Sequence, residues 1–134
     1  MTDESATGDA GIIQLMIIAR GCTGPLSDVQ ALAAGCVAAV RDVEFQIVAD
    51  TSYAFTPHGA TVALVLAQSH LVVSTWPEHR FAIADLTICG PKASAMRLWR
   101  FLKDVLRPED EEITEHPISF ARTAMATTES GNRP

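Results

Sequence analysis

Three strand-like runs follow one another in residues 61–90, which read TVALVLAQSHLVVSTWPEHRFAIADLTICG. The runs are Thr61–Ala67, His70–Thr75 and Phe81–Cys89. They are joined through Gln68-Ser69 and through Pro77-Glu78-His79, which are short polar connections. Because connections this short join neighbouring antiparallel strands, the stretch predicts an antiparallel sheet.

Further strands are predicted on both sides of this stretch. Ile12–Ala19 is a run of apolar, largely β-branched residues, as in a buried strand. Glu44–Asp50 alternates between apolar and polar residues, and a turn at Thr56-Pro57-His58-Gly59 follows it. Residues 112–122 could add one more strand.

Two other segments have the spacing of amphipathic helices. The first begins at Ser27, where Gln30 would complete a capping box. Its apolar positions are Val29, Leu32, Ala33, Cys36, Val37 and Val40. The second begins near Pro91 and ends before Pro108, with apolar positions Ala95, Leu98, Trp99, Leu102, Val105 and Leu106. Each helix therefore has one apolar face that can pack on a sheet.

The order of these elements predicts an α+β fold. We expect a two-layer sandwich, a mostly antiparallel sheet with two helices on one face. The other face of the sheet must then meet solvent or form an interface. Residues 11–122 form the predicted domain, and residues 1–10 and 123–134 are predicted to be disordered end segments.

Composition limits the class of protein. The chain has 134 residues, of which 48% are hydrophobic, so it can form one compact core and is not an intrinsically disordered protein. No apolar stretch approaches the ~20 residues that a membrane span needs, and no signal peptide precedes the domain. The net charge of -6 argues against a nucleic-acid surface. Three cysteines without zinc spacing predict no metal site and a reduced, cytoplasmic protein.

Small polar residues interrupt the apolar pattern of residues 61–90. Period-two alternation places Asp85, Thr87 and Cys89 on one face of their strand, opposite Ala84, Leu86 and Ile88. A serine, a histidine and a cysteine on adjacent strands could form a nucleophilic site. A polar patch between strands, without catalytic function, is the alternative.

Residues 67–78, AQSHLVVSTWPE, resemble the processing-site motif of prokaryotic S-adenosylmethionine decarboxylases, which reads close to E-S-H-x-x-x-H-T-W-P-E. Phe55-x-Pro57-x-Gly59 resembles the family's F-x-P-x-G turn. Asp85-Leu86-x-x-Cys89-Gly90 resembles its D-x-F-T-C-G ending, at the same spacing from the serine. Gly21-Cys22 fits a G-C pair after the first strand. The resemblance covers about Gln14 to Leu106, and the chain is identified as a divergent member of the family.

The resemblance implies a self-processing enzyme with a covalent pyruvoyl group. In the family, a serine hydroxyl attacks the preceding peptide carbonyl, and the serine becomes the pyruvoyl group. Here the Gln68–Ser69 bond would break, giving subunits 1–68 and 69–134. The pyruvoyl ketone derived from Ser69 forms a Schiff base with the substrate and accepts the electrons released with CO2. Cys89 aligns with the family's proton donor, and Thr61 aligns with a serine that assists processing.

The chain departs from the family pattern at several positions. Ser74 stands where the family has a histidine that promotes self-cleavage, and Gln68 replaces a glutamate. On the first strand, Gln14, Ile18 and Arg20 replace a histidine, an aspartate and a tyrosine. Processing is therefore expected to be slower, because a serine hydroxyl has no pKa near neutrality. His58 or His79 could supply the imidazole, although each also fits a surface turn.

Other residues of the motif have two interpretations each. His70 is a catalytic candidate, or it hydrogen-bonds across the sheet. Phe55, Trp76 and Glu78 are expected to bind substrate, but a tryptophan at the edge of the core and a carboxylate in a turn are alternatives for the last two.

The favoured function is decarboxylation of S-adenosylmethionine, which supplies the aminopropyl donor for spermidine synthesis. One alternative is a pyruvoyl-dependent decarboxylase of arginine or ornithine. The other is an unprocessed homologue that serves as a binding or regulatory subunit. The expected partners are a small-molecule substrate and a second copy of the chain, because one sheet face is left uncovered.

Overall fold

The computed structural model describes residues 11–122 of the chain; the two predicted end segments lie outside the described residues. The elements are β1 (Gly11–Arg20), α2 (Val29–Asp42), β2 (Ile47–Ala54), β3 (Ala60–Leu66), β4 (Ser69–Trp76), the 3-10 helix η1 (Pro77–His79), β5 (Phe81–Cys89), α3 (Lys92–Leu106) and β6 (Asp110–Ser119). Within this part of the chain, neither α-helix is long and apolar enough to cross a membrane.

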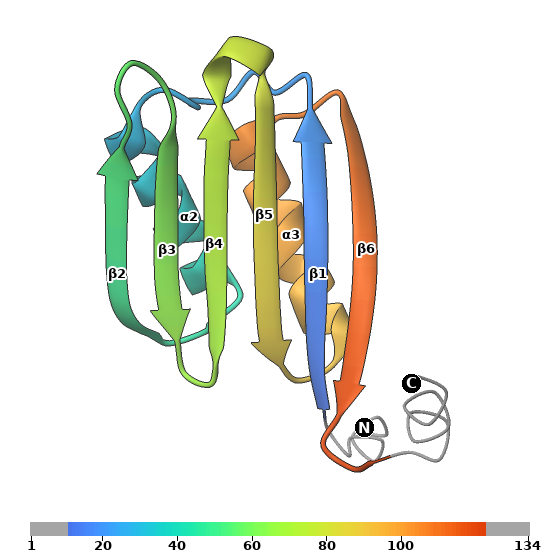
Figure 1. The fold of residues 1–134 in the computed structure, drawn as a ribbon. Helices are drawn as coiled ribbons and strands as arrows, with labels where there is room; N and C mark the ends of the chain where they lie inside the picture. Colours follow the sequence, from blue (N-terminus) through green and yellow to red (C-terminus); the bar gives the residue numbers. More distant parts are fainter. Residues whose placement is uncertain (1–10, 123–134) are drawn as a thin grey trace, which may run out of the picture.

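The six strands form one sheet in the order β2-β3-β4-β5-β1-β6, and every neighbouring pair is antiparallel. Both α-helices lie on the same face of this sheet (Figure 1). The predicted α+β two-layer sandwich is therefore confirmed. We call the end of the sheet with the β3–β4 turn the lower end, and the end with the β2–β3 loop and η1 the upper end (Figure 1).

The core lies between the sheet and the helices. Alternate residues of the central strands point toward the helices and are almost fully buried, among them Leu15, Ile17, Leu71, Val73, Leu86 and Ile88. The helices contribute Leu32, Cys36, Leu98, Trp99 and Leu102. Asp85, Thr87 and Cys89 have the opposite parity on β5 and lie on the uncovered face, as the alternation predicted.

Two predicted boundaries were wrong. The first helix begins at Val29, and its N-cap is Asp28, whose carboxylate accepts a hydrogen bond from the Ala31 N–H at 3.0 Å. The predicted capping box at Ser27 is therefore absent. The second strand runs from Ile47 to Ala54 rather than from Glu44 to Asp50. It pairs on one side only, with β3, and is exposed along most of its length, so it carries little of the alternation that marks a half-buried strand.

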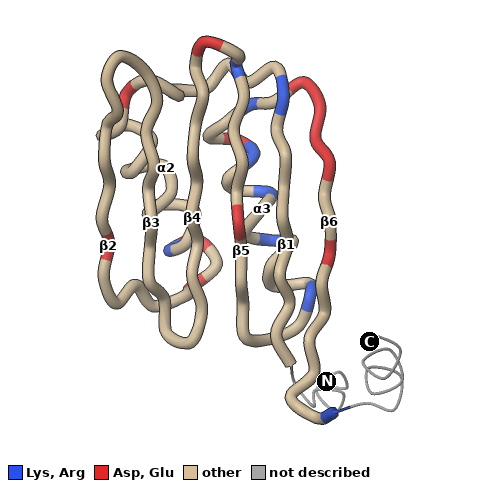
Figure 2. The backbone as a smooth tube through the Cα atoms, in the orientation of Figure 1, with Lys and Arg blue, Asp and Glu red and all other residues tan. Residues whose placement is uncertain are grey.

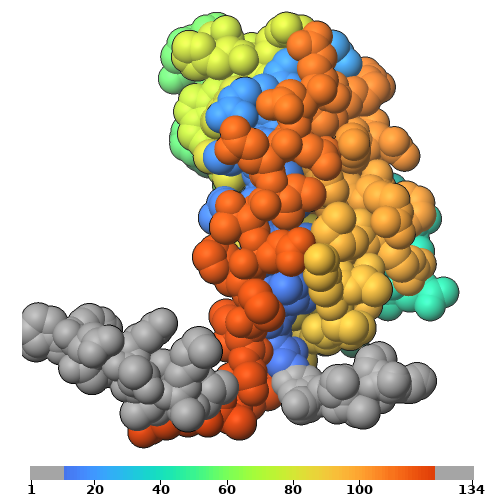
Figure 3. All heavy atoms as spheres, turned by 90° about the vertical axis from the view of Figure 1, so that its right-hand side faces the viewer, coloured from blue at the N-terminus to red at the C-terminus, as the bar shows by residue number. Residues whose placement is uncertain are grey.

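The helices are fixed to each other and to the last strand. Gly35 of α2 lies so close to Val105 of α3 that an added Cβ would come within 2.7 Å of a Val105 methyl group. On the other side of α3, Lys92 pairs with Glu115 at 2.8 Å and Lys103 pairs with Glu111 at 3.2 Å, both on β6. Figure 3 shows β6 beside α3 along this edge of the molecule. The predicted strand at residues 112–122 is thus present, starting two residues earlier at Asp110.

Thr75 is the buried polar residue that holds the upper end together. Its hydroxyl donates to the Leu26 carbonyl at 2.9 Å and accepts from the Ala60 N–H at 3.0 Å. Because Leu26 lies just before α2, this hydroxyl ties the start of the helix to β3 and β4. A buried hydroxyl that both donates and accepts a hydrogen bond costs little free energy of folding, whereas the loss of one of these partners would destabilise the fold.

Candidate active site

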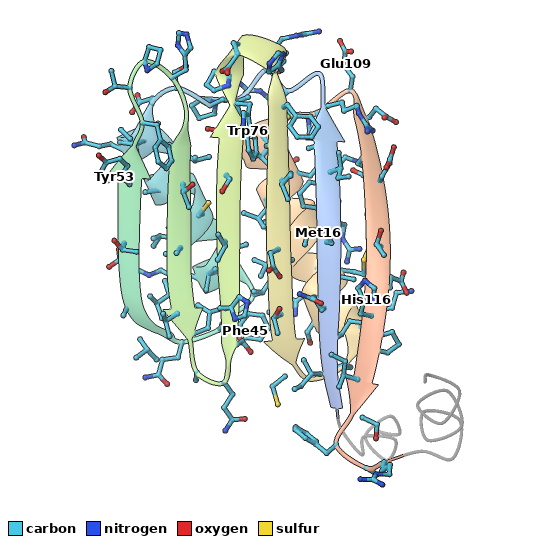
Figure 4. The ribbon with its side chains drawn as sticks, viewed as in Figure 1. Met16, Phe45, Tyr53, Trp76, Glu109 and His116 are labelled. Carbon is cyan, nitrogen blue, oxygen red and sulfur yellow. The ribbon has the colours of Figure 1, made fainter. Side chains whose placement is uncertain are left out.

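The uncovered face of the sheet carries most of the polar residues that the sequence singled out, and Ser69 is the exception. Figure 4 looks onto this face and labels Met16, Tyr53, Trp76 and His116 on four of its strands. Charges are sparse there: β1 to β5 contain three Asp, Glu, Lys or Arg residues, namely Arg20, Asp50 and Asp85 (Figure 2). The part of this face formed by β1 to β5 is as poor in charge as the core of a protein interface, whereas β6 at the edge adds carboxylates, Glu112 among them.

Ser69 begins β4 at the lower end of the sheet, directly after the two-residue turn Ala67-Gln68. Its Oγ accepts a hydrogen bond from the backbone N–H of Cys89 at 3.0 Å. The two residues that the sequence assigned to bond cleavage and to proton donation are therefore in direct contact. The hydrogen bond fixes the serine oxygen and leaves its own proton free for transfer.

The serine and the thiol have opposite strand parities. Ser69 has the parity of Leu71 and Val73, which face the helices, whereas Cys89 has the parity of Asp85 on the uncovered face. The backbone N–H of Cys89 contacts the Ser69 hydroxyl, whereas the Cys89 side chain points to the uncovered face. The two side chains therefore lie on opposite faces of the sheet.

Ser74 and Thr61 form a second pair on the uncovered face. They are opposite one another in the β3–β4 register, and their hydroxyl oxygens lie 2.9 Å apart. Ser74 is five residues from Ser69 along one strand, which corresponds to roughly 16 Å. Within a single chain, Ser74 is therefore too far from Ser69 for direct proton transfer. His58 and His79, in the β2–β3 loop and η1, also lie at the upper end.

Asp85 is the centre of a hydrogen-bonded cluster that the sequence analysis did not assemble. Its carboxylate accepts from Thr87 at 3.1 Å and from the Gln14 amide at 3.4 Å, and it lies 3.9 Å from Nε2 of His70. Asp85 was part of the recognised motif. Gln14 and His70 lie beside it because of the β1–β5 and β4–β5 registers, which the sequence did not predict. At 3.9 Å His70 lies beside Asp85 but beyond hydrogen-bond distance, so both interpretations of His70 stay predictions.

The three residues expected to bind substrate all lie at the upper end, away from Ser69. Trp76 packs against Phe81 in an edge-on contact with ring centroids 5.6 Å apart, and Phe55 packs in the same way against Tyr53 at 5.0 Å. Tyr53, Phe55 and Trp76 keep at least 38% of their surface exposed. Glu78 is exposed in η1. Tyr53 was missed because its strand was placed too early in the chain.

Two residues of β1 that differ from the family pattern, Ile18 and Arg20, lie beside Glu112 of β6. Arg20 extends from the end of β1 and forms an ion pair with Glu112 of β6 at 2.7 Å. Glu112 lies opposite Ile18 in the β1–β6 register, so this part of the face has a carboxylate on the neighbouring strand. The Glu112 carboxylate raises the pKa of the exposed Arg20 side chain.

The three cysteines divide into two kinds. Cys22 and Cys36 are buried, and burial raises the pKa of both thiols, that of Cys36 to about 12. They remain protonated hydrophobic residues. Cys89 is partly exposed. Among residues 11–122, no three His, Cys, Asp or Glu side chains are grouped so that they could hold a metal ion.

Comparison with known proteins agrees with the motif. The family model described as S-adenosylmethionine decarboxylase matches residues 14–117. The S-adenosylmethionine decarboxylase proenzyme of Sulfurihydrogenibium sp. is 34% identical over 95 residues, 69% of each chain. The proenzyme of Aquifex aeolicus is 35% identical over 82 residues, 60% of this chain and 61% of the relative.

A solved structure supports the fold. The crystal structure of the adenosylmethionine decarboxylase from Aquifex aeolicus VF5 superimposes with a TM-score of 0.78 at 24% identity. The match covers 84% of this chain and 94% of that one.

Proposed function

The chain belongs to the S-adenosylmethionine decarboxylase family, and from this premise we propose that it is a self-processing carboxy-lyase acting on S-adenosylmethionine, with Ser69 as the source of a pyruvoyl group. Its product would be the aminopropyl donor for spermidine synthesis. One observation carries the assignment: the Ser69 hydroxyl and Cys89, matched to the family motif from sequence, meet through a 3.0 Å hydrogen bond. Three free thiols support a reducing, cytoplasmic location.

Processing begins at the bond between Gln68 and Ser69. The Ser69 oxygen bonds to the Gln68 carbonyl carbon, the C–N bond breaks, and the hydroxyl proton passes to the released amine. The resulting ester then loses the Gln68 carboxylate and the Cα proton of residue 69 by elimination, and water converts the remaining dehydroalanine to a pyruvoyl group and ammonia. The Cys89 N–H already donates to the oxygen that becomes the ester oxygen, so it can stabilise the carboxylate as it leaves.

The pyruvoyl group supplies a ketone that condenses with an amine and withdraws electrons as CO2 departs. The chain's own contribution is a position for that group and a proton donor beside it. Cleavage makes residue 69 a chain terminus, which allows it to rotate from the helix side of β4 toward the Cys89 thiol. A thiol beside that group can serve as the general acid that returns a proton to the substrate carbon.

We further propose that two copies pack through their uncovered faces and complete each other's sites. The Thr61–Ser74 pair lies roughly 16 Å along β4 from its own Ser69, too far for proton transfer. A two-fold axis that lies between the two sheets, parallel to them and perpendicular to their strands, would bring the upper end of one copy over the lower end of the other. The aromatic residues expected to contact substrate would then lie near the partner's Ser69 position.

A complementation experiment tests this arrangement. A Ser69→Ala chain cannot cleave but keeps the hydroxyl pair, and a Thr61→Val/Ser74→Ala chain keeps Ser69 but lacks the pair. If the pair acts between copies, the second chain cleaves only after the two are denatured together and refolded as a mixture. Cleavage of the Thr61→Val/Ser74→Ala chain alone at the wild-type rate would contradict a role for the pair.

The substrate is tested by the release of CO2 from labelled S-adenosylmethionine, arginine and ornithine. We expect turnover with S-adenosylmethionine. Activity confined to arginine or ornithine would instead favour the related pyruvoyl decarboxylases, in line with the altered first strand around Ile18 and Arg20. The second candidate function, an unprocessed binding or regulatory subunit, is favoured by Ser74 and Gln68. It predicts no CO2 release and no chain cleavage.

A further inference from the structure

Gln68 has an unusual backbone conformation. Four non-glycine residues within residues 11–122 have a positive φ: Glu44, Gln68, Arg80 and Arg107. Arg80 and Arg107 are the C-caps of η1 and α3, and Glu44 follows the C-cap of α2. A left-handed residue is the ordinary way to end a helix, so these three have a structural explanation. Gln68, with a φ of +61°, does not end a helix.

The turn that contains Gln68 is also of an unfavourable kind. Two-residue hairpin turns that match the twist of a sheet have a positive φ at their first central residue, which here is Ala67. Ala67 is not among the residues with positive φ, so only the second position is left-handed. Glycine or asparagine usually occupies such a position. A glutamine there is strained, because residues with a Cβ rarely adopt a positive φ.

The surroundings prevent the turn from relaxing. Leu66 and Ser69 are paired partners on either side of it, and the Leu66 side chain is 2% exposed in the core. The Ala67 N–H donates to the Gln46 carbonyl at 3.1 Å, and the Ser69 hydroxyl accepts from the Cys89 N–H. Strained backbone persists where neighbouring contacts determine it in this way.

We propose that the left-handed strain at Gln68 drives the self-cleavage of the Gln68–Ser69 bond. Gln68 supplies the carbonyl of the peptide bond that breaks. When the Ser69 oxygen bonds to this carbonyl carbon, the carbon becomes tetrahedral and the planar peptide bond that holds Gln68 in the turn is lost, which releases the strain. The C–N bond then breaks and the hydroxyl proton moves to the Ser69 nitrogen. This inference rests on the proposed function and concerns its first step.

The test compares cleavage rates of three variants. Each proenzyme is purified in denaturant, refolded, and followed by intact mass from the time of refolding. Gln68→Gly removes the Cβ and should slow cleavage by about five- to thirty-fold, the rate equivalent of one left-handed residue's strain. Gln68→Ala keeps the Cβ but lacks the amide, and should cleave faster than Gln68→Gly. Ala67→Gly, a control for turn flexibility, should cleave at the wild-type rate.

A second measurement uses chains that cannot cleave. In the Ser69→Ala background, Gln68→Gly should have a higher Tm than Gln68→Ala if the turn is strained. An equal or lower Tm, or Gln68→Gly cleavage as fast as wild type, would overturn the strain inference and leave the proposed function intact. Absence of cleavage in the wild-type chain would contradict both the strain inference and the proposed function.

Discussion

Ser74 is the residue whose expected position changes most once the fold is known. A serine and a threonine hydroxyl at 2.9 Å can share a proton but cannot hold one as an imidazole does. In the proposed dimer this pair lies near the partner's processing site, so an imidazole at position 74 would be brought close to the bond that breaks.

Replacing Ser74 with histidine should therefore accelerate self-cleavage. General acid–base catalysis commonly contributes 10²–10⁴-fold, and we expect an increase of about tenfold or more. The measurement is the fraction of cleaved chain against time after refolding. Ser74→Asn, which is polar but does not titrate, is the control and should not accelerate cleavage. No acceleration with histidine would mean that processing relies on other groups, with His58 and His79 the next residues to replace.

Replacing the Cys89 side chain should reduce turnover but not processing. Processing depends on the Cys89 backbone N–H, whereas turnover depends on the thiol. Cys89→Ala keeps the N–H that holds the Ser69 oxygen, so the chain should still cleave. Turnover should fall by roughly 10²-fold or more with loss of the general acid, whereas a small cavity alone would cost about 1 kcal/mol of stability.

Misplaced protonation should also convert the pyruvoyl group to alanine. The mass of the 69–134 fragment after incubation with substrate detects this change. Cys36→Ala, at a buried thiol, is the control and should keep its turnover. Wild-type turnover in Cys89→Ala, without an alanine-terminated fragment, would show that Cys89 is only a structural thiol.

The sequence predicted which face of a strand a residue occupies better than it predicted the contacts between strands. Cys89 could be assigned to the uncovered face because alternation along β5 is regular. The Thr61–Ser74 contact and the Asp85 cluster depend on register between strands, which the hydrophobic pattern alone did not specify. The distance from Ser74 to Ser69 could have been foreseen, since five residues of any strand span roughly 16 Å.

Among the elements, those with one buried face were predicted well and exposed ones were not. The bounds of β5 agree with the predicted Phe81–Cys89, because every second residue of this strand is buried. β2 was placed too early because its residues are exposed and follow no burial period. The start of α2 was missed by one residue because Ser27 and Asp28 are both good N-caps, and sequence does not decide between them.

The packing of α2 against α3 gives a prediction that opposes helix propensity. Gly35→Ala should by propensity stabilise the helix by about 1 kcal/mol. The added Cβ would lie 2.7 Å from a Val105 methyl group, and overpacking of this kind costs about 1–3 kcal/mol. We therefore expect a lower free energy of unfolding, measured with denaturant.

The matched control is the same substitution in a Val105→Ala chain. With the methyl groups removed, Gly35→Ala should become stabilising, so the two effects should have opposite signs. Stabilisation by Gly35→Ala in both backgrounds would show that the helices are less closely packed than the structure indicates.

At the scale of the whole molecule, the uncovered sheet face predicts a homodimer. The face is poor in charge and exposes Tyr53, Val65, Trp76 and Ile118, each by at least 38%. Light scattering at micromolar concentration should give the mass of two copies. Val72→Asp, in the middle of this face, should give monomers, whereas Phe101→Asp on the helix side should remain dimeric. A monomeric wild-type chain would contradict the proposed completion of each site by the partner.

Self-cleavage between Gln68 and Ser69 is the claim on which the whole account depends, and intact-mass spectrometry of the purified chain tests it most directly. We predict two fragments, residues 1–68 and residues 69–134, the second beginning with a pyruvoyl group in place of serine. Ser69→Ala should remain a single chain under the same conditions. A wild-type protein that stays full-length after prolonged incubation would contradict the pyruvoyl mechanism and support the unprocessed subunit instead.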